Sequence, residues 1–195
     1  MEKAEGLLIL RCMNYLINRI VTTTAHVGFN KACDCFGIKL VEVPVNKSFE
    51  MDIEMLKKKI NKNTICIGAS YPNNINGICD NIQEIAKIAS KFEIPFHVDA
   101  GLGGLLTAFY KDQALPKCDF TIKGITSISI DFHRYGVSPL GISVVMYSDR
   151  TYRKNHYFIY NQWSGGIYPC PGFPGSRSPA TLVAAFSLLM YLGKN

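Results

Sequence analysis

The sequence lacks the features that mark disordered, fibrous or membrane-spanning chains. Only 18% of its 195 residues are charged and 48% are hydrophobic, which excludes a disordered or low-complexity protein. No apolar run approaches the roughly 18 residues that a membrane-spanning helix requires. No internal repeat or linker is visible either. The chain is therefore expected to form one globular domain, or part of a larger one.

Metal-binding and targeting motifs are also missing. The seven cysteines are odd in number and include no Cys-x-x-Cys, and the four histidines lie far apart. A zinc site needs paired ligands at short spacing, so we expect no metal site and predict free thiols in a reducing compartment. Residues 1–6 match neither a secretory signal nor an Arg-rich transit peptide. We therefore expect the chain, as it stands, in the cytoplasm.

Charge of one sign is in modest excess. The chain has 21 basic and 15 acidic residues, a net charge of +6, and its densest basic run is Lys57-Lys58-Lys59. Three lysines on an amphipathic helix are usually its solvated face, so we expect no nucleic-acid partner. A mild positive field suits a phosphorylated substrate or cofactor without identifying one.

The apolar periodicity predicts alternating helices and strands. A βαβ unit is expected in the middle of the chain, and such units build a parallel sheet with helical cover. The predicted fold class is therefore α/β, with a mainly parallel sheet and helices on both faces. The chain stops after its last helix, so we expect part of an α/β domain. Helices are predicted over 7–20, 29–36, 52–60, 81–92 and 181–192, and strands over 38–43, 64–69, 94–98, 119–123, 126–131 and 142–147.

Three polar segments are candidates for chemistry, because ligands of open α/β sheets bind beyond the carboxyl ends of the strands. Asp99 follows a predicted strand and precedes a glycine-rich stretch, where it either binds a ligand or caps the next turn. Residues 127–136 run into His133 and Arg134, natural phosphate partners, although an ordinary surface loop fits them too. Residues 165–178 are rich in glycine and proline and predict a shaped loop that could hold an anion.

The order and spacing of longer motifs resemble the sphingosine-1-phosphate lyases, a family of pyridoxal-phosphate (PLP) enzymes with the aspartate-aminotransferase-like fold of fold type I. The resemblance extends from about residue 5 to residue 195. It implies that residues 1–195 are part of the large domain of such an enzyme. The motifs that carry it are Ala25-His26-Val27-Gly28-Phe29-Asn30-Lys31-Ala32, His97-Val98-Asp99-Ala100, Lys123-Gly124-Ile125-Thr126-Ser127-Ile128-Ser129, and Trp163 to Tyr168 with Gly175-Ser176-Arg177.

The resemblance implies a role for each matching residue. Asp99 matches the carboxylate that pairs with the pyridine nitrogen and keeps the ring protonated as an electron sink. His26 matches the imidazole that stacks on the ring, with a core or capping histidine as the alternative. His133 matches a phosphate contact, and Ser176 matches a residue that reaches the phosphate from a neighbouring subunit, which implies a homodimer. The family reaction is the retro-aldol cleavage of a phosphorylated sphingoid base to a fatty aldehyde and phosphoethanolamine.

The chain departs from the family at positions that carry the chemistry. Arg134 stands where the family has the lysine that forms the Schiff base with PLP. A guanidinium, with a pKa above about 12, stays protonated and cannot attack an aldehyde, whereas a desolvated lysine can. Leu140 replaces a substrate-binding lysine, Phe132 a threonine, and residues 2–5 a Gly-Gly-Thr phosphate loop. From the resemblance we expect the chain to lack the family's N-terminal anchor in the endoplasmic reticulum membrane and its C-terminal small domain.

Four functions are therefore open. A pseudoenzyme would keep the fold and bind PLP without covalent attachment. An active lyase would need an unexpected lysine, such as Lys123, or an external amine. An interaction protein would dock on a full-length lyase subunit through the dimer face that contains Ser176. A truncated product without function would expose an apolar interface and be unstable. The loss of the anchor lysine favours a catalytically impaired or inactive chain.

Overall fold

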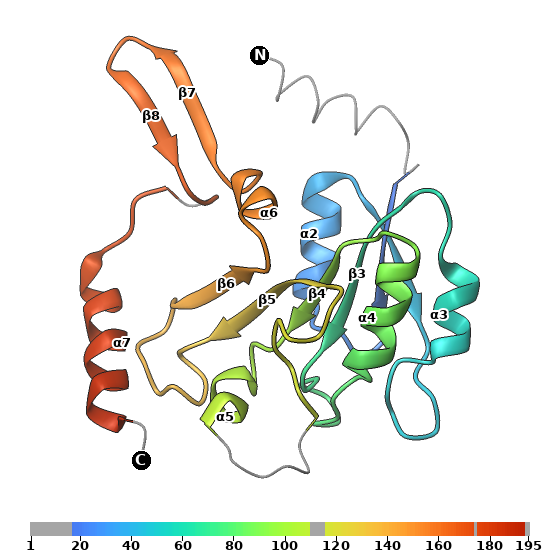
Figure 1. The fold of residues 1–195 in the computed structure, drawn as a ribbon. Helices are drawn as coiled ribbons and strands as arrows, with labels where there is room; N and C mark the ends of the chain where they lie inside the picture. The colour runs from blue at the N-terminus through green and yellow to red at the C-terminus, as the bar shows by residue number, and fades with distance from the viewer. Residues whose placement is uncertain (1–16, 110–115, 174, 194–195) are drawn as a thin grey trace.

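The computed structural model describes residues 17–109, 116–173 and 175–193. A six-stranded sheet with five helices in contact with it forms the main body, and a two-stranded hairpin and a last helix stand away from it (Figure 1). The elements in chain order are β1 (Asn18–Thr22), α2 (Gly28–Phe36), β2 (Lys39–Val43), α3 (Ile53–Lys59), β3 (Thr64–Ser70), α4 (Ile82–Lys91), β4 (Phe96–Asp99), α5 (Gly104–Phe109), β5 (Ile125–Asp131), β6 (Ser143–Tyr147), α6 (Arg150–Lys154), β7 (Phe158–Trp163), β8 (Gly166–Cys170) and α7 (Pro179–Leu192).

The sheet is mainly parallel, as the sequence predicts. Its strand order is β2-β1-β3-β4-β5-β6, and only β6 runs antiparallel to its neighbour. The chain leaves β1 to one side for β2 and then crosses to the other side for β3. That reversal makes a topological switch point at the carboxyl ends of β1 and β3, where open α/β sheets bind their ligands.

Helices cover both faces of the sheet, which confirms the predicted α/β class. Alternation along β3 separates the two faces: Ile67 lies in the apolar core with Ile85 of α4 and Leu56 of α3. The next residue, Gly68, points to the opposite face, where an added Cβ would meet Phe29 of α2 at 3.1 Å. The face under α2 is the one that carries the polar side chains of β4 and β5.

The predicted helix boundaries rest on local caps that the structure shows. The Asp52 side chain accepts a hydrogen bond from the backbone N–H of Met55 at the start of α3, and Asn81 caps α4 through Glu84 in the same way. Gly37 ends α2 with a φ of 65°, a left-handed conformation that glycine adopts at no steric cost. All six cysteines in the described ranges are free thiols, as expected.

One predicted helix is wrong at its end, and one predicted strand is wrong. The helix predicted over 7–20 conflicts with β1, because residues 18–22 pair in parallel with both β2 and β3; the earlier part of that helix lies outside the described residues. The three misassigned residues, Asn-Arg-Ile, are too few for their apolar pattern to separate a strand from the end of a helix. The strand predicted over 119–123 is a turn, since the Asp119 side chain accepts hydrogen bonds from the N–H and hydroxyl of Thr121.

The shaped loop predicted over 165–178 is partly regular. Residues 166–170 form β8, which pairs antiparallel with β7 in the hairpin, and only the stretch before α7 is irregular. Apolar and polar residues alternate only weakly in this hairpin. Nearly all its residues are exposed, so neither face of the strands has to be apolar. Within the described ranges, no helix is both long enough and apolar enough to span a membrane.

Candidate functional site

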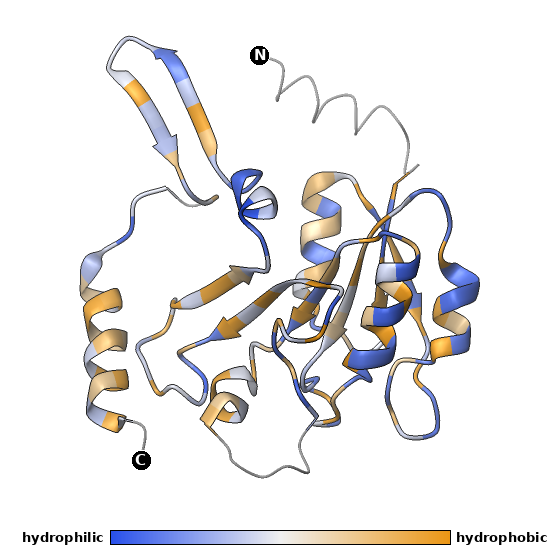
Figure 2. Ribbon diagram, viewed as in Figure 1, coloured by the Kyte–Doolittle hydropathy of each residue, from blue (hydrophilic) through white to orange (hydrophobic). Residues whose placement is uncertain are grey.

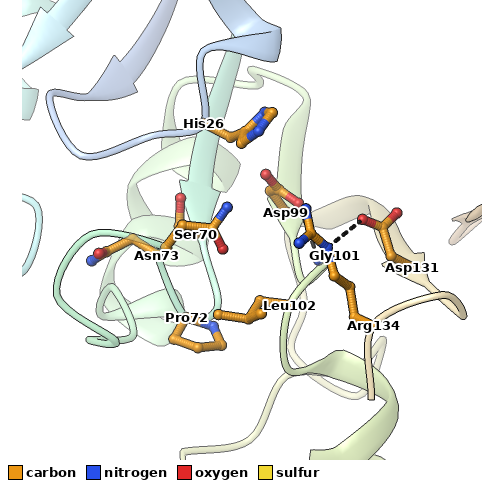
Figure 3. A pocket seen from close by; sticks show the side chains of 10 residues that line it. His26, Ser70, Pro72, Asn73, Asp99, Gly101, Leu102, Asp131 and Arg134 are labelled. Carbon is orange, nitrogen blue, oxygen red and sulfur yellow. Dashed lines mark hydrogen bonds and ion pairs between the residues drawn. The ribbon is translucent and has the colours of Figure 1, made fainter. Parts of the chain in front are cut away.

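A cavity of about 190 Å³ lies at the carboxyl ends of the parallel strands, beside the switch point (Figure 3). The loop after β1 supplies His26, the end of β3 supplies Ser70, and β4 and β5 end on Asp99 and Asp131. A neighbouring cavity of about 250 Å³ extends over the face under α2 and shares His26 and Asp99 with the first. These two residues therefore stand where both cavities meet.

Asp99 presents one carboxylate oxygen to the cavities. Its Oδ1 accepts hydrogen bonds from the backbone N–H of Gly101 at 3.1 Å and from the Ser129 hydroxyl at 3.3 Å. Its Oδ2 has no hydrogen-bond partner among the residues that the structure describes. The carboxylate is thus held through Oδ1, and its pairing with the pyridine nitrogen of PLP stays a prediction.

His26 is exposed at the rim, and its ring has two contacts of different kinds. The backbone N–H of Gly28 donates to Nδ1 at 3.1 Å, at the start of α2, while the ring also lines both cavities. Figure 3 shows the ring on the opposite side of the cavity from Pro72 and Leu102. The ring therefore makes a local bond at the start of α2 and also lines the cavities, and its stacking on a cofactor stays a prediction.

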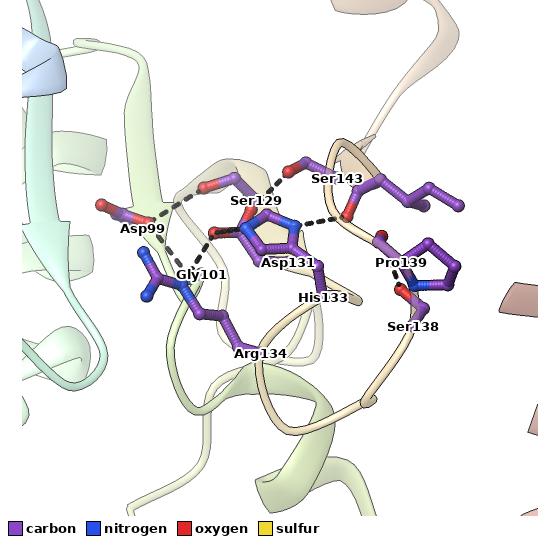
Figure 4. Close-up of polar contacts among 10 residues, drawn as sticks. Asp99, Gly101, Ser129, Asp131, His133, Arg134, Ser138, Pro139 and Ser143 are labelled. Carbon is purple, nitrogen blue, oxygen red and sulfur yellow. Dashed lines mark hydrogen bonds and ion pairs between the residues drawn. The ribbon is translucent and has the colours of Figure 1, made fainter. Parts of the chain in front are cut away.

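Arg134 lies in the same cavity, paired with an acid. Its Nε is 3.7 Å from Asp131 Oδ2, and the two carboxylates of Asp131 and Asp99 flank Gly101 (Figure 4). A Cβ on Gly101 would come within 3.1 Å of Asp99 Oδ1 and 3.2 Å of Asp131 Oδ2, so a side chain there would crowd both carboxylates. The guanidinium therefore places a positive charge beside the Asp131 carboxylate in this cavity.

Two predicted site residues lie outside both cavities. The ring of His133 hydrogen-bonds the Ile142 carbonyl through Nδ1 at 3.1 Å, and its Nε2 is 3.7 Å from Asp131 Oδ2 (Figure 4). Ser176 lies in the irregular stretch before α7 and lines neither cavity. The structure therefore brings together His26, Asp99 and Arg134, whereas the phosphate roles of His133 and Ser176 remain predictions.

Several lining residues received no role from the sequence. Asp131 pairs with Arg134, Ser129 hydrogen-bonds Asp99, and Ser70 closes the end of β3. The alternation of side chains along β5, with a period of two residues, could have predicted the positions of Asp131 and Ser129. Ser129 and Asp131 are two residues apart, so they share one face of the strand.

Polar side chains at the switch point of a mainly parallel α/β sheet are typical of ligand-binding sites in this fold class, and sequence comparison specifies the family. The model of the pyridoxal-dependent decarboxylase conserved domain matches residues 10–161. The chain belongs to this family.

Within that family, the chain is similar to sphingosine-1-phosphate lyases. It is 44% identical over 179 residues to sphingosine-1-phosphate lyase 1 of Rattus norvegicus and 41% identical over 180 residues to the Saccharomyces cerevisiae lyase, covering 90% of this chain in each case. It spans about a third of the length of these relatives, 32% and 31%. The solved structure of the Burkholderia pseudomallei K96243 sphingosine-1-phosphate lyase superposes with a TM-score of 0.87 at 30% identity, over 96% of this chain and 45% of that one. A Lactobacillus brevis glutamate decarboxylase, 22% identical with a TM-score of 0.79, shares the fold.

The residues present fit a pyridoxal ring but not its covalent attachment. Asp99 Oδ2 and the His26 ring offer what the pyridine nitrogen and the ring face need. Among the described residues, no lysine lines either cavity. Lys123 precedes β5, whereas Asp131 ends it, so the length of the strand, roughly 20 Å, separates the lysine from the cavity.

Proposed function

We propose that this chain is a non-catalytic relative of the sphingosine-1-phosphate lyases that binds PLP without a covalent bond. The observation that carries the proposal is Arg134, which lines the cavity with His26 and Asp99 where the family has its Schiff-base lysine. The guanidinium cannot form that bond at physiological pH. On this proposal residues 1–195 correspond to part of the large, cofactor-binding domain of the lyases.

Each residue then has a defined part in holding the cofactor. Asp99 keeps a proton on the pyridine nitrogen, and His26 packs against the ring. Bound PLP supplies an electron sink for breaking a bond next to an amine. Arg134 holds a positive charge near the position of the reacting group, which suits the phosphate or carboxylate of a ligand rather than proton transfer. A phosphorylated sphingoid base is the ligand class that the relatives' name suggests.

The test compares the natural chain with Arg134→Lys by visible absorption and borohydride reduction in the presence of PLP. We expect the natural chain to bind PLP reversibly and to retain none after reduction and denaturation. Arg134→Lys restores an amine beside Asp99, so reduction should fix PLP at position 134, as mass spectrometry of peptides would show. Arg150→Lys, on exposed α6, is the matched control and should behave like the natural chain.

Two results would overturn the proposal. Fixation of PLP on a lysine of the natural chain would reveal a substitute anchor and favour an active lyase. Absence of binding in both the natural chain and Arg134→Lys would mean that the cavity does not accept the cofactor at all.

A second function is favoured by the surface of the molecule. α7 and the hairpin expose large apolar side chains, among them Trp163 and Phe186. Ser176 precedes α7, and in the resemblance it belongs to the face through which two subunits meet. We therefore also propose that the chain pairs through this surface, either with a second copy or with a full-length lyase subunit.

A further inference from the structure

A continuous chain of side-chain hydrogen bonds leads from β5 to Asp99. In the parallel pairing of β4 and β5, His97 is opposite Ser127 and Asp99 is opposite Ser129. His97 Nδ1 is 2.8 Å from the Ser127 hydroxyl oxygen, and its Nε2 is 3.2 Å from the Ser129 hydroxyl oxygen. The Ser129 hydroxyl is in turn 3.3 Å from Asp99 Oδ1. All four side chains lie on the face of the sheet under α2.

The number of protons available in this hydrogen-bonded series of side chains determines which atom carries each proton. An ionised Asp99 only accepts, so the single hydroxyl proton of Ser129 points to Oδ1. The Ser129 oxygen must then accept from His97, which puts a proton on Nε2. A neutral imidazole has one proton, so Nδ1 accepts from the Ser127 hydroxyl. Every hydrogen bond in the chain is satisfied by this arrangement.

The imidazole is neutral at physiological pH. Burial under α2 and then the charge of Arg19 lower the pKa of His97 to about 4. The edge of the ring also contacts Phe29 of α2, with the centroids 6.2 Å apart. A protonated ring would donate from Nδ1 as well, so the direction of its hydrogen bond with the Ser127 hydroxyl would reverse.

We propose that His97, protonated on Nε2, is a positioning residue that holds the carboxylate of Asp99 through Ser129. With Gly101, the Ser129 hydroxyl occupies Oδ1 and leaves Oδ2 turned toward the cavity. The importance of this orientation for cofactor binding rests on the proposed function, whereas the tautomer and its coupling to Asp99 do not.

The tautomer is measured first, in the cofactor-free chain, by nitrogen NMR of the imidazoles. The signal of His97 is identified among the four histidines by its loss in His97→Gln. We expect a protonated Nε2 and a bare Nδ1 at neutral pH. A proton on Nδ1 would overturn the proposal.

The coupling is measured in the same cofactor-free protein from the carboxyl carbon resonance of Asp99. We expect this resonance to move in His97→Leu and Ser129→Ala, and to move less in His97→Gln, whose amide can still donate to Ser129. Ser148→Ala is the matched control, because Ser148 bonds only the exposed carbonyl of Thr126. A resonance that stays in place in His97→Leu would show that the ring merely fills space.

The consequence for the cofactor is measured as the affinity for free PLP. We expect His97→Leu and Ser129→Ala to weaken binding about tenfold, and His97→Gln to recover most of it. If the natural chain binds no PLP, the proposed function is wrong, while the tautomer and the Asp99 resonance still decide the coupling. If binding is normal and His97→Leu leaves it unchanged, the positioning role is wrong.

Discussion

At the scale of single residues, Asp80 hydrogen-bonds two segments that are distant in the sequence, at Met51 and at Ser70. Its side chain is 1% exposed and accepts hydrogen bonds from the backbone N–H of Met51 at 2.7 Å and of Ser70 at 2.8 Å. Burial, with a smaller contribution from Glu50, outweighs these bonds and raises the pKa of Asp80 to about 6. Because Ser70 lines the cavity, the Asp80 carboxyl helps to hold one of the residues that form the site.

The raised pKa of Asp80 predicts how stability depends on pH. The folded chain holds this proton up to about pH 6, whereas the unfolded chain releases it near 3.8. The folded state binds more protons in that window, so this group lowers the free energy of unfolding by about 2–3 kcal/mol as the pH rises through it. Urea unfolding from pH 4 to 7 should show this loss in the natural chain and not in Asp80→Asn.

The same substitution should also weaken the fold at every pH. An amide places its NH₂ against one of the two backbone N–H groups, which costs about 1–3 kcal/mol. Glu42→Gln is the control, because Glu42 is exposed and forms no ion pair with the described residues, and it should change stability and its pH dependence little. Equal slopes for the natural chain and Asp80→Asn would mean that Asp80 titrates normally.

At the scale of elements, the glycines after β4 set how closely α5 packs beside the cavity. A Cβ on Gly103 would lie 2.6 Å from Cδ of Pro72, which lines the cavity, and one on Gly104 would lie 3.0 Å from Ile130 of β5. The absence of a side chain at both positions therefore lets α5 lie against β5 and the loop after β3.

Gly103→Ala should lower the free energy of unfolding by about 1–3 kcal/mol, because the added methyl forces Pro72 or α5 to move. Chemical denaturation measures this loss, and weaker PLP binding should accompany it. Gly77→Asn is the control: its surroundings are open, and asparagine tolerates the φ of 69° at this position. Equal stability of the two variants would show that the loop adjusts freely.

Predictions at this scale succeeded where the signal is local. Asp52 and Asn81 cap their helices, and the alternation of helices with short apolar runs predicted the parallel sheet. Asp99 at the end of β4 followed from the same pattern. The failure at residues 18–22 has a tertiary cause, since the pairing of β1 with both β2 and β3 decides it. Residues 119–123 failed because a side-chain turn competes with the strand.

At the scale of the whole molecule, α7 is an apolar helix without a described partner surface. Its sequence Pro-Ala-Thr-Leu-Val-Ala-Ala-Phe-Ser-Leu-Leu-Met-Tyr-Leu contains no charged residue, and Figure 2 shows it as largely hydrophobic. Leu182, Phe186 and Met190 are 66%, 63% and 67% exposed. Helices that are apolar on all sides are normally covered, so another subunit is the expected cover.

Replacing Leu182, Phe186 and Met190 together by serine should therefore abolish association. We expect light scattering to show the natural chain as a dimer, or as a complex when mixed with a full-length lyase such as the yeast protein. The triple variant should be monomeric and form no complex, while Phe49→Ser, at an isolated exposed site, should behave like the natural chain. A natural chain that stays monomeric and ignores the lyase would contradict both proposed partners.

Local chemistry along the chain was enough to specify its class. Helix caps, apolar periodicity and short motifs depend on a few neighbouring residues, so they can be recognised from the sequence alone. This holds for the motifs around His26 and Asp99. The sequence also shows directly that arginine replaces lysine at position 134. Only the tertiary structure decided that Asp131 pairs with Arg134, that His133 hydrogen-bonds the Ile142 carbonyl, and that Ser129 links His97 to Asp99. These contacts join separate strands, and the register between strands is set by packing across the whole sheet rather than by neighbours in sequence.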